Sequence, residues 1–422
     1  MPHPMRAPRE RRAHDRRSQR GRRPRHCPPS AVCRHRRSRP PTRPHARGGV
    51  TVPSTSSTDL NPSADTRTRQ EPRCPEHPTT RNSLAPKAFS GFHDAYGAVL
   101  ADLLEAPGHI STRGNAGPER LNVSFQLDNP AARLPMFAAR RANIVFNLAE
   151  VLWFLGGRDD LAMMRYYAPR MSSYSVDGVT IAGAAYGTRM FRAGRGGRSS
   201  FDATLDLVRA DPDTKRAVIP IFGAHEVGDA EHPDVSCTIA FQLFRRDEQL
   251  HGVCYMRAND AFQGLVSDVF SFTVIQELGA RMLGLQLGTY THHVGSMHIA
   301  DHHLPKARAI VAEAEQAPPR WDVPTMPAGT TRDTVEEVCA QEAQLRANRV
   351  THTVDSLHAT GLPVYWQRLV ALLEVHRQLV HQPEHRVDEE LLEFLDPAHR
   401  WLMHRKWPTR ITRPRAAGRD VA

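Results

Sequence analysis

Cys237 is the residue of this sequence best suited to nucleophilic chemistry. It stands early in an extended apolar run, SCTIAFQLF (236–244), and Arg257 follows twenty residues later. A neighbouring arginine stabilises a thiolate and can also bind a phosphate group. A free cysteine is more often only a small buried apolar side chain, so the chemistry must be argued from the residues around Cys237.

Arg257 belongs to a second segment rich in polar side chains, YMRANDAFQGLVSD (255–268). The pattern predicts a strand ending in Arg, Asn and Asp, then Gly264, then a helix beginning near Asp268. Such an order brings several polar groups to one edge of a sheet. Together with Cys237, it indicates a site for a small phosphorylated molecule.

Five histidines close together suggest zinc as an alternative. Three or four imidazoles on one strand and loop could meet a metal ion. No cysteine or carboxylate completes a usual ligand spacing, so we predict no metal site. The histidines are His292, His293, His298, His302 and His303.

The net charge of +11 comes from the N-terminal segment. Residues 1–50 hold 16 arginines and two acidic residues, so the remaining 372 residues carry a net charge of −3. Residues 1–85 are rich in Arg, Pro and Ser and are expected to be a disordered extension. There are four alternative interpretations of this segment: a flexible tail, a start codon placed too far upstream, a transit peptide or a nucleic-acid-binding arm. A non-enzymatic nucleic-acid-binding protein would lose its affinity on deletion of residues 1–80, whereas an enzyme would keep its activity.

The composition excludes several classes of protein. Hydrophobic residues make up 40% and charged residues 24%, as in globular proteins. No apolar run approaches the roughly 18 residues that a membrane span needs. Six cysteines in 422 residues do not make a disulfide scaffold, and no apolar signal core follows the first basic residues. We therefore expect a cytoplasmic protein that does not bind membranes.

The hydrophobic periodicity predicts a mixed order of helices and strands, an α+β fold within a single catalytic domain at 86–422. A polar turn at 245–248 joins two extended runs into the clearest hairpin. The expected helices are 91–105, 141–156, 266–283, 362–381 and 388–405, and the expected strands are 121–127, 216–222, 236–244, 249–257 and 285–294.

In six ordered segments the chain resembles the thymidylate synthase superfamily, from about 113 to about 303. No single segment is specific for the family, but six segments in the same order and with similar spacings are specific for it. The resemblance implies the family's α+β fold, a large mixed sheet covered by helices, whose free face forms a homodimer. Residues 310–422 match nothing. The segments are LAEVLWFLGG (148–157), AAYG (184–187), DPDTKRAVIP (211–220), SCTIAFQLF (236–244), YMRANDAFQGLVSD (255–268) and HHVGSMHIADHH (292–303).

The resemblance implies a covalent mechanism at a pyrimidine. Attack of the Cys237 thiolate on C6 makes C5 nucleophilic toward the one-carbon unit of 5,10-methylenetetrahydrofolate. Glu150 would manage proton transfers through water, and Tyr186 would assist removal of the C5 proton.

The same resemblance assigns the binding residues. Arg257 would bind the substrate phosphate within its own subunit, and Lys215 and Arg216 would reach the phosphate site of the partner. Arg113 would belong to a mobile phosphate loop, and His298 would contact the sugar. On the folate side the implied residues are Asp260, Gly264 and Arg140.

One departure from the family bears on the base. Thymidylate synthases have Asn where this chain has Asp268. An amide can serve both O4 and N3–H of uracil, whereas an ionised carboxylate only accepts and suits the amino group of cytosine. The substitution resembles the pyrimidine 5-hydroxymethylase branch, whose members act on cytidylates.

Further departures bear on the sugar and on the one-carbon unit. The family's Ser and Tyr beside the sugar are Ala258 and Ala300 here, which leaves room for a ribose hydroxyl. Thr238 replaces the histidine after the nucleophile, and Tyr174 stands where a tryptophan contacts folate. A less enclosed folate side favours water as the final nucleophile, so that tetrahydrofolate is released.

We therefore predict C5 hydroxymethylation of a cytidine monophosphate, with CMP favoured over dCMP. Within the family the chain most resembles the CMP 5-hydroxymethylases of nucleoside-antibiotic biosynthesis. The alternatives are methylation of dUMP, as in thymidylate synthases, and hydroxymethylation of dCMP.

Overall fold

Within the described residues, seven strands form one mixed sheet in the order β1-β3-β7-β6-β5-β4, with β2 beside β3. Strands β1 and β3 run parallel, as do β6 and β7, and the remaining pairs are antiparallel. The computed structural model describes residues 85–110, 116–194, 196–228, 232–316 and 322–411. The strands are β1 (Lys87–Phe89), β2 (Gly108–Ile110), β3 (Ala116–Leu127), β4 (Val218–Pro220), β5 (Thr238–Arg246), β6 (Gln249–Asp260) and β7 (Gln286–His298).

The expected hairpin is confirmed as β5–β6. Arg246 pairs with Gln249 across a two-residue turn. Asp247 and Glu248 have φ angles of 48° and 58°. Two consecutive positive φ angles are typical of the tight turn whose twist matches that of the adjoining strands.

Helix α6 (Leu265–Leu283) connects the parallel strands β6 and β7. All residues from Leu265 to Ala280 are buried, because the helix lies between the sheet and α2 (Ile144–Leu155). It ends at Gly284, whose φ of 69° suits a residue without a Cβ. The other helices on this part of the fold are α1 (Phe92–Leu104), α3 (Leu161–Tyr167), α4 (Tyr186–Met190), α5 (Ser200–Ala210) and α7 (Leu304–Ala314).

The opposite face of the sheet is covered much less. Side chains alternate along β6 and β7, so that Cys254 and His292 are buried toward α6 while Val253 and Thr291 remain half-buried on the other face. Val218 on β4 belongs to the same outer row, through its pairing with Gln242, and is 39% exposed.

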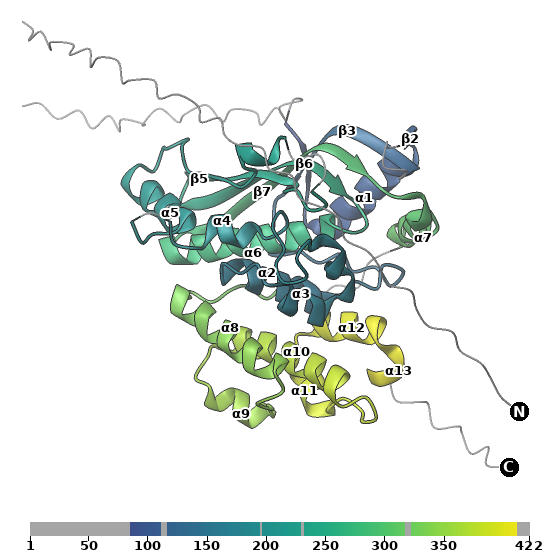
Figure 1. Ribbon diagram of the computed structural model, residues 1–422, viewed down its shortest axis with the longest axis vertical. Helices are drawn as coiled ribbons and strands as arrows, with labels where there is room; N and C mark the ends of the chain where they lie inside the picture. Colours follow the sequence, from purple (N-terminus) through teal and green to yellow (C-terminus); the bar gives the residue numbers. More distant parts are fainter. Residues whose placement is uncertain (1–84, 111–115, 195, 229–231, 317–321, 412–422) are drawn as a thin grey trace, which may run out of the picture. The chain divides into compact units, whose positions relative to one another are not determined.

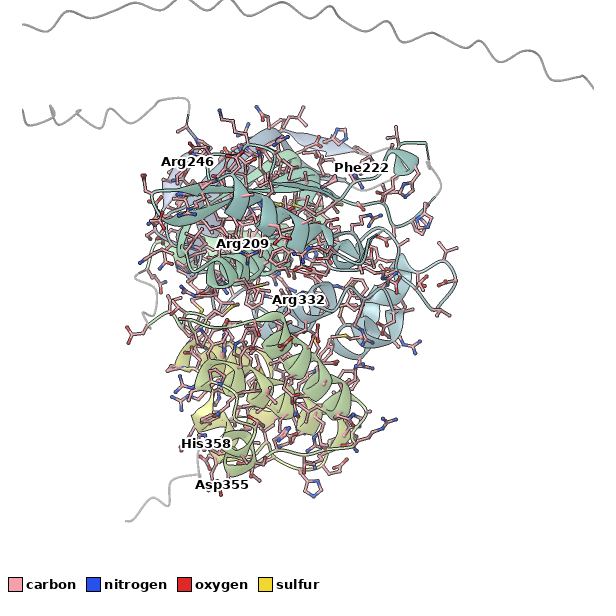
Figure 2. The ribbon with its side chains drawn as sticks, turned by 90° about the vertical axis from the view of Figure 1, so that its left-hand side faces the viewer. Arg209, Phe222, Arg246, Arg332, Asp355 and His358 are labelled. Atoms are coloured by element: carbon pink, nitrogen blue, oxygen red, sulfur yellow. The ribbon has the colours of Figure 1, made fainter. Side chains whose placement is uncertain are left out.

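A third layer, made of the helices from residue 332 onward, packs on α2 (Figure 1). Figure 2 shows Arg332, the first residue of α8, near the junction, and Asp355 and His358 of α9 at the far end. Arg133 and Glu277 form a buried ion pair of 2.5 Å, and the Met326 amide donates to the same carboxylate at 2.7 Å. The helices of this layer are α8 (Arg332–Arg346), α9 (Val354–Ala359), α10 (Val364–His381), α11 (Glu389–Phe394), α12 (Pro397–Lys406) and α13 (Pro408–Ile411).

The α+β prediction is confirmed, with corrections at element ends. The single helix expected at 388–405 is two helices, because Asp396 caps the amide of Ala398 and Pro397 opens a new first turn. Strand β6 continues past Arg257 to Asp260, since its pairing with β7 persists to His298. No described helix combines the length and apolar character needed to cross a membrane. The expected N-terminal extension lies outside the described residues.

Candidate active site

A cavity of about 620 Å³ opens where the ends of β6 and β7 meet α2, α4 and α6. All three residues predicted to be catalytic line it, together with six predicted to bind substrate or cofactor. They are Cys237, Glu150, Tyr186, Arg257, Ala258, Asp260, Gly264, Asp268 and His298.

Strand register brings these residues together. The amide of Arg257 donates to the carbonyl of Cys237 at 2.8 Å, which joins the nucleophile segment to the end of β6. The parallel pairing of β6 with β7 sets Asp260 opposite His298. The site therefore depends on contacts between segments that are distant in the sequence.

Arg257 lies against the Cys237 thiol, with its Nη2 3.7 Å from Sγ. Its Nε and Nη2 also donate to the carbonyls of Ser236 and Val235 at 2.8 and 2.9 Å. Burial raises the pKa of Cys237, and the nearby Arg257 only partly lowers it again. The expected lowering by arginine is thus present but outweighed, and the thiol is mainly protonated before substrate binds.

Two carboxyl groups of the cavity have pKa values well above the ordinary range for a carboxyl group. Burial, with the nearby Asp268 charge, raises the pKa of Glu150 to about 8. Burial also raises the pKa of Asp268 to about 7, although a hydrogen bond from Asn259 lowers it. Selection of cytosine by Asp268 requires the ionised form. Near neutral pH the protonated form is also populated, and a carboxylic acid can donate as well as accept.

Tyr186 is held as a neutral phenol. Burial and the neighbouring Asp268 charge raise its pKa well above the ordinary value. Its ring packs 5.3 Å from Phe154 and 6.1 Å from Phe272. A Cβ on Gly187 would lie 2.3 Å from the Phe154 backbone, so α4 approaches α2 closely only because this residue is glycine.

The cavity also contains polar residues that the sequence analysis did not predict. Asn259 was expected among the polar groups at the end of its strand, but no role was assigned to it. Arg170 lies with its guanidinium 5.5 Å from the centre of the Phe146 ring. The unpredicted polar residues are Asn259, Arg170, Glu226, His232, Asp234, Gln263 and Ser267.

Three described residues that were predicted to bind substrate or cofactor do not line this cavity. Lys215 and Arg216 are exposed just before β4. Arg140 donates to the Tyr96 hydroxyl at 3.1 Å and to the Phe262 carbonyl at 2.6 Å, so a direct role in the cavity is not supported. Arg113 lies outside the described residues.

Only some of the residues predicted beside the sugar, and only one of the clustered histidines, line the cavity. Ala258 and His298 line the cavity, whereas Ala300 does not. His292 is fully buried, and burial lowers its pKa to about 3. His293 stacks on Tyr255 at 5.3 Å on the half-exposed face of the sheet. No three metal-ligating side chains converge in the part of the chain that the structure describes.

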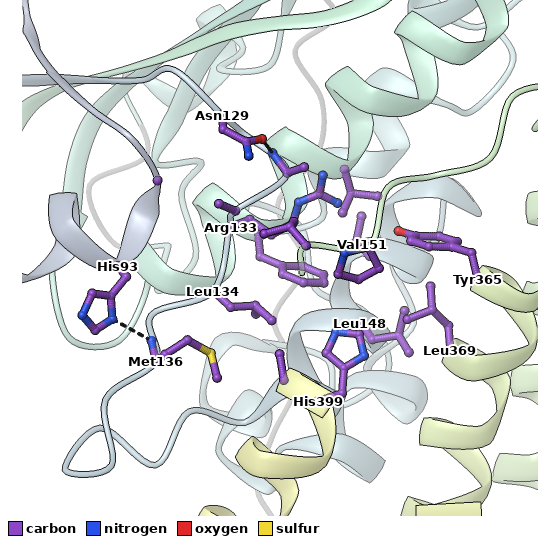
Figure 3. Close-up of a pocket in the computed structure, with 18 of the residues that line it drawn as sticks. His93, Asn129, Arg133, Leu134, Met136, Leu148, Val151, Tyr365, Leu369 and His399 are labelled. Carbon is purple, nitrogen blue, oxygen red and sulfur yellow. Dashed lines mark hydrogen bonds between the residues drawn. The ribbon is translucent and has the colours of Figure 1, made fainter. Parts of the chain in front are cut away.

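A second cavity, of about 640 Å³, lies between helices α2 and α6 on one side and α10 and α12 on the other (Figure 3). Its walls are mainly apolar, including Leu148 and Val151 of α2 and Leu369 of α10, and His399 points into it from α12. None of the predicted site residues lines it.

The sequence of this chain is similar to those of known proteins. Residues 95–345 match the sequence model of a family described as thymidylate synthase. The match extends into α8, so the expectation that residues 310–422 match nothing is wrong for residues 310–345. A deoxyuridylate hydroxymethyltransferase of Bacillus phage SP01 is 28% identical over 214 residues, which are 48% of this chain and 56% of the relative. The chain thus spans little more than half the length of that relative.

Proposed function

Because the chain belongs to the thymidylate synthase family, we propose that it is a one-carbon transferase that hydroxymethylates C5 of a cytidine monophosphate. The donor is 5,10-methylenetetrahydrofolate. The observation that carries this proposal is the cavity that joins Cys237, Arg257 and Asp268 to the two proton-handling residues Glu150 and Tyr186. We assign the reaction to the cytoplasm, where thiols stay reduced.

The chain's own residues account for the steps at the nucleotide. Arg257 binds the phosphate and favours the Cys237 thiolate, which adds to C6 and makes C5 nucleophilic. C5 would take the one-carbon unit, and Tyr186 and Glu150 would guide the C5 proton to water. Loss of that proton would break the bond between the transferred carbon and the folate nitrogen, which leaves a methylene on C5 and tetrahydrofolate as the leaving group. Water then adds to the methylene on C5, and Cys237 leaves C6. The products are a 5-hydroxymethyl nucleotide and tetrahydrofolate, without oxidation or reduction.

The cavity walls fit a folate. Phe146 and Met171 offer an apolar wall for a flat ring, beside Tyr174 and Arg170. The Asp260 carboxylate is fixed by amides of Phe262 and Gln263, both at 2.7 Å. When bound, the folate supplies carbon at the oxidation level of formaldehyde. Asp260 and Tyr174 would orient it, and Gly264 would leave room for it.

The choice of cytosine rests on Asp268. In its ionised form this side chain accepts from the cytosine amino group and repels uracil O4. The phage relative is named for deoxyuridylate, so it supports hydroxymethylation while leaving uracil as the competing base. The preference for CMP over dCMP, as in the CMP 5-hydroxymethylases of antibiotic pathways, rests on Ala258, which leaves space where the family has a serine hydroxyl.

We also propose a symmetric homodimer through the uncovered face of the sheet. Half-buried Val253 and Thr291, with exposed Val218, support this assignment because they lie on a sheet face that no described helix covers. Lys215 and Arg216 are exposed outside the cavity of their own chain, as cross-subunit phosphate ligands would be.

Incubation with 5,10-methylenetetrahydrofolate and each of CMP, dCMP, UMP and dUMP tests the proposal. Product masses should show one added CH₂O on CMP, with less on dCMP. Methylated dUMP together with dihydrofolate would identify a thymidylate synthase instead. A strong preference for dCMP would retain hydroxymethylation and overturn the argument from Ala258.

A further inference from the structure

The second cavity is separate from the candidate active site, although helix α2 forms part of the wall of both. Phe146, Glu150 and Phe154 line the active-site cavity, whereas Leu148 and Leu152 line the second cavity. Residues four apart share one face of a helix, and the two sets are offset by two residues, so they lie on opposite faces. A molecule in the second cavity is therefore separated from the reacting groups by the helix itself.

The size and the walls of the second cavity suit a small apolar molecule. Phe270 and Val274 of α6 and Trp366 of α10 add to the apolar wall, and the volume is about 640 Å³. Sites for small molecules enclose about 300–1,000 Å³ and are lined mainly by apolar side chains. The cavity reaches the surface beside Asp94 and Asn129, which are both exposed, so a ligand has a route of entry.

The imidazole of His399 is the polar group of this cavity that lacks a partner. The residue is only 6% exposed, and its side chain points into the cavity from α12 (Figure 3). Among the described residues of the wall, it alone has a buried side-chain nitrogen or oxygen, Nδ1, without a hydrogen bond. Burial lowers the pKa of His399 well below its ordinary value, so the ring is neutral, with one donor and one acceptor nitrogen.

The other buried groups of the wall do not favour a charged ligand. Arg133 is the only buried charged side chain among the described residues that line the cavity, and it is 2.5 Å from the Glu277 carboxylate. Its Nε donates to the Pro130 carbonyl at 3.2 Å. A charged ligand would lose its hydration between apolar walls without gaining a free counter-ion inside.

We propose that the second cavity binds a small neutral molecule with an apolar body and one hydroxyl group, which hydrogen-bonds to His399. A hydroxyl can donate to the acceptor nitrogen or accept from the donor nitrogen, so it suits either tautomer of the ring. The apolar body displaces poorly bound water from the walls. This binding goes beyond the proposed reaction and does not depend on it.

Calorimetric titration of the full-length protein with 4-propylphenol and with propylbenzene tests the proposal. The two probes differ only in the hydroxyl group, and neither nucleotide nor folate is added. Wild type should bind one 4-propylphenol saturably. His399→Leu keeps an apolar side chain of similar size but removes the imidazole. It should weaken 4-propylphenol roughly 5- to 10-fold, as expected for one lost hydrogen bond between neutral groups, and change propylbenzene little.

Two further variants locate the binding. His385→Leu is the matched control, because His385 is exposed in the turn after α10 and does not line the cavity. It should leave the affinities of both probes unchanged. Leu369→Trp places a larger side chain in the cavity wall and should abolish binding of both probes.

The ratio of the two affinities decides between a binding role and a structural role for His399. Equal weakening of both probes by His399→Leu would overturn the proposal, because a structural defect does not distinguish them. Absence of saturable 4-propylphenol binding by wild type would also overturn it, whatever else occupies the cavity. Unaltered binding by a folded Leu369→Trp variant would place the probe elsewhere. If that variant does not fold, the ratio measured with His399→Leu still decides.

Discussion

At the scale of single residues, Cys237 carries the proposed chemistry. Cys237→Ala should abolish product formation and also tritium release from a C5-labelled nucleotide, because both require addition to C6. Cys339→Ala is the control of the same type. That thiol lies outside the cavity on α8, against the Leu152 carbonyl at 3.7 Å, and its loss should leave tritium release near the wild-type rate. Substantial exchange by the Cys237 variant would exclude the covalent route.

The carboxyl of Glu150 gives a stability prediction with a definite sign. Its pKa is raised from 4.5 to about 8 in the folded chain, so the unfolded chain loses this proton first as pH rises. The contribution of Glu150 to stability should therefore fall between about pH 4.5 and 8. Glu150→Gln should remove that loss and raise the unfolding free energy at pH 8 by about 1–3 kcal/mol, less than the full shift implies because the cavity admits water.

Urea unfolding of both proteins at pH 5 and pH 8 provides the measurement. The difference between variant and wild type should be larger at pH 8. An equal difference at both values would mean that Glu150 does not retain its proton in the folded state.

Asp268 permits a direct test of base choice. Asp268→Asn should shift preference from cytosine toward uracil nucleotides, because the amide can serve both O4 and N3–H. One good polar pairing corresponds to about 1–3 kcal/mol, or roughly 5- to 150-fold in relative kcat/KM. Competition between CMP and UMP in one reaction measures the ratio, and an unchanged ratio would remove Asp268 from base recognition.

At the scale of elements, the close approach of α4 to α2 positions Tyr186. Gly187→Ala should destabilise the protein by about 1–3 kcal/mol, because the new methyl group meets the Phe154 backbone and cannot displace it easily. Activity should fall with stability, since Tyr186 begins the same helix. Thermal unfolding measures the loss.

Gly108→Ala is the control, because nothing lies within 4 Å of a Cβ at that position and its φ is not in the left-handed region. Its unfolding temperature should stay close to that of wild type. Similar losses in both variants would mean that the helix contact is not the cause.

Elements with strong local signals could be predicted from the sequence. The β5–β6 hairpin has a polar turn between alternating runs, and α6 has a long apolar pattern. The division between α11 and α12 was missed, because the Asp396 cap and Pro397 interrupt a hydrophobic pattern that continues across them. Site residues in ordered motifs were predicted together, whereas Arg170 and Asn259 are functional candidates only through their three-dimensional surroundings.

At the scale of the whole molecule, the proposed dimer predicts complementation. A Cys237→Ala subunit mixed with a Lys215→Ala/Arg216→Ala subunit should recover about a quarter to half of wild-type activity per dimer, as expected when one of two sites is intact. That site combines its own cysteine with basic residues from the partner. Absence of recovery in verified heterodimers would contradict the cross-subunit role of Lys215 and Arg216.

The parallel pairing of β6 with β7 has a consequence for synthesis on the ribosome. Because α6 must cross between these strands, the cavity cannot close until His298 has left the exit tunnel. The helices that cover α2 come later still, at α8, α10 and α12. At roughly 5–20 residues per second, the nascent chain exposes the apolar surfaces of α2 and α6 for several seconds. During that interval, a chaperone that shields them would protect the nascent chain from aggregation.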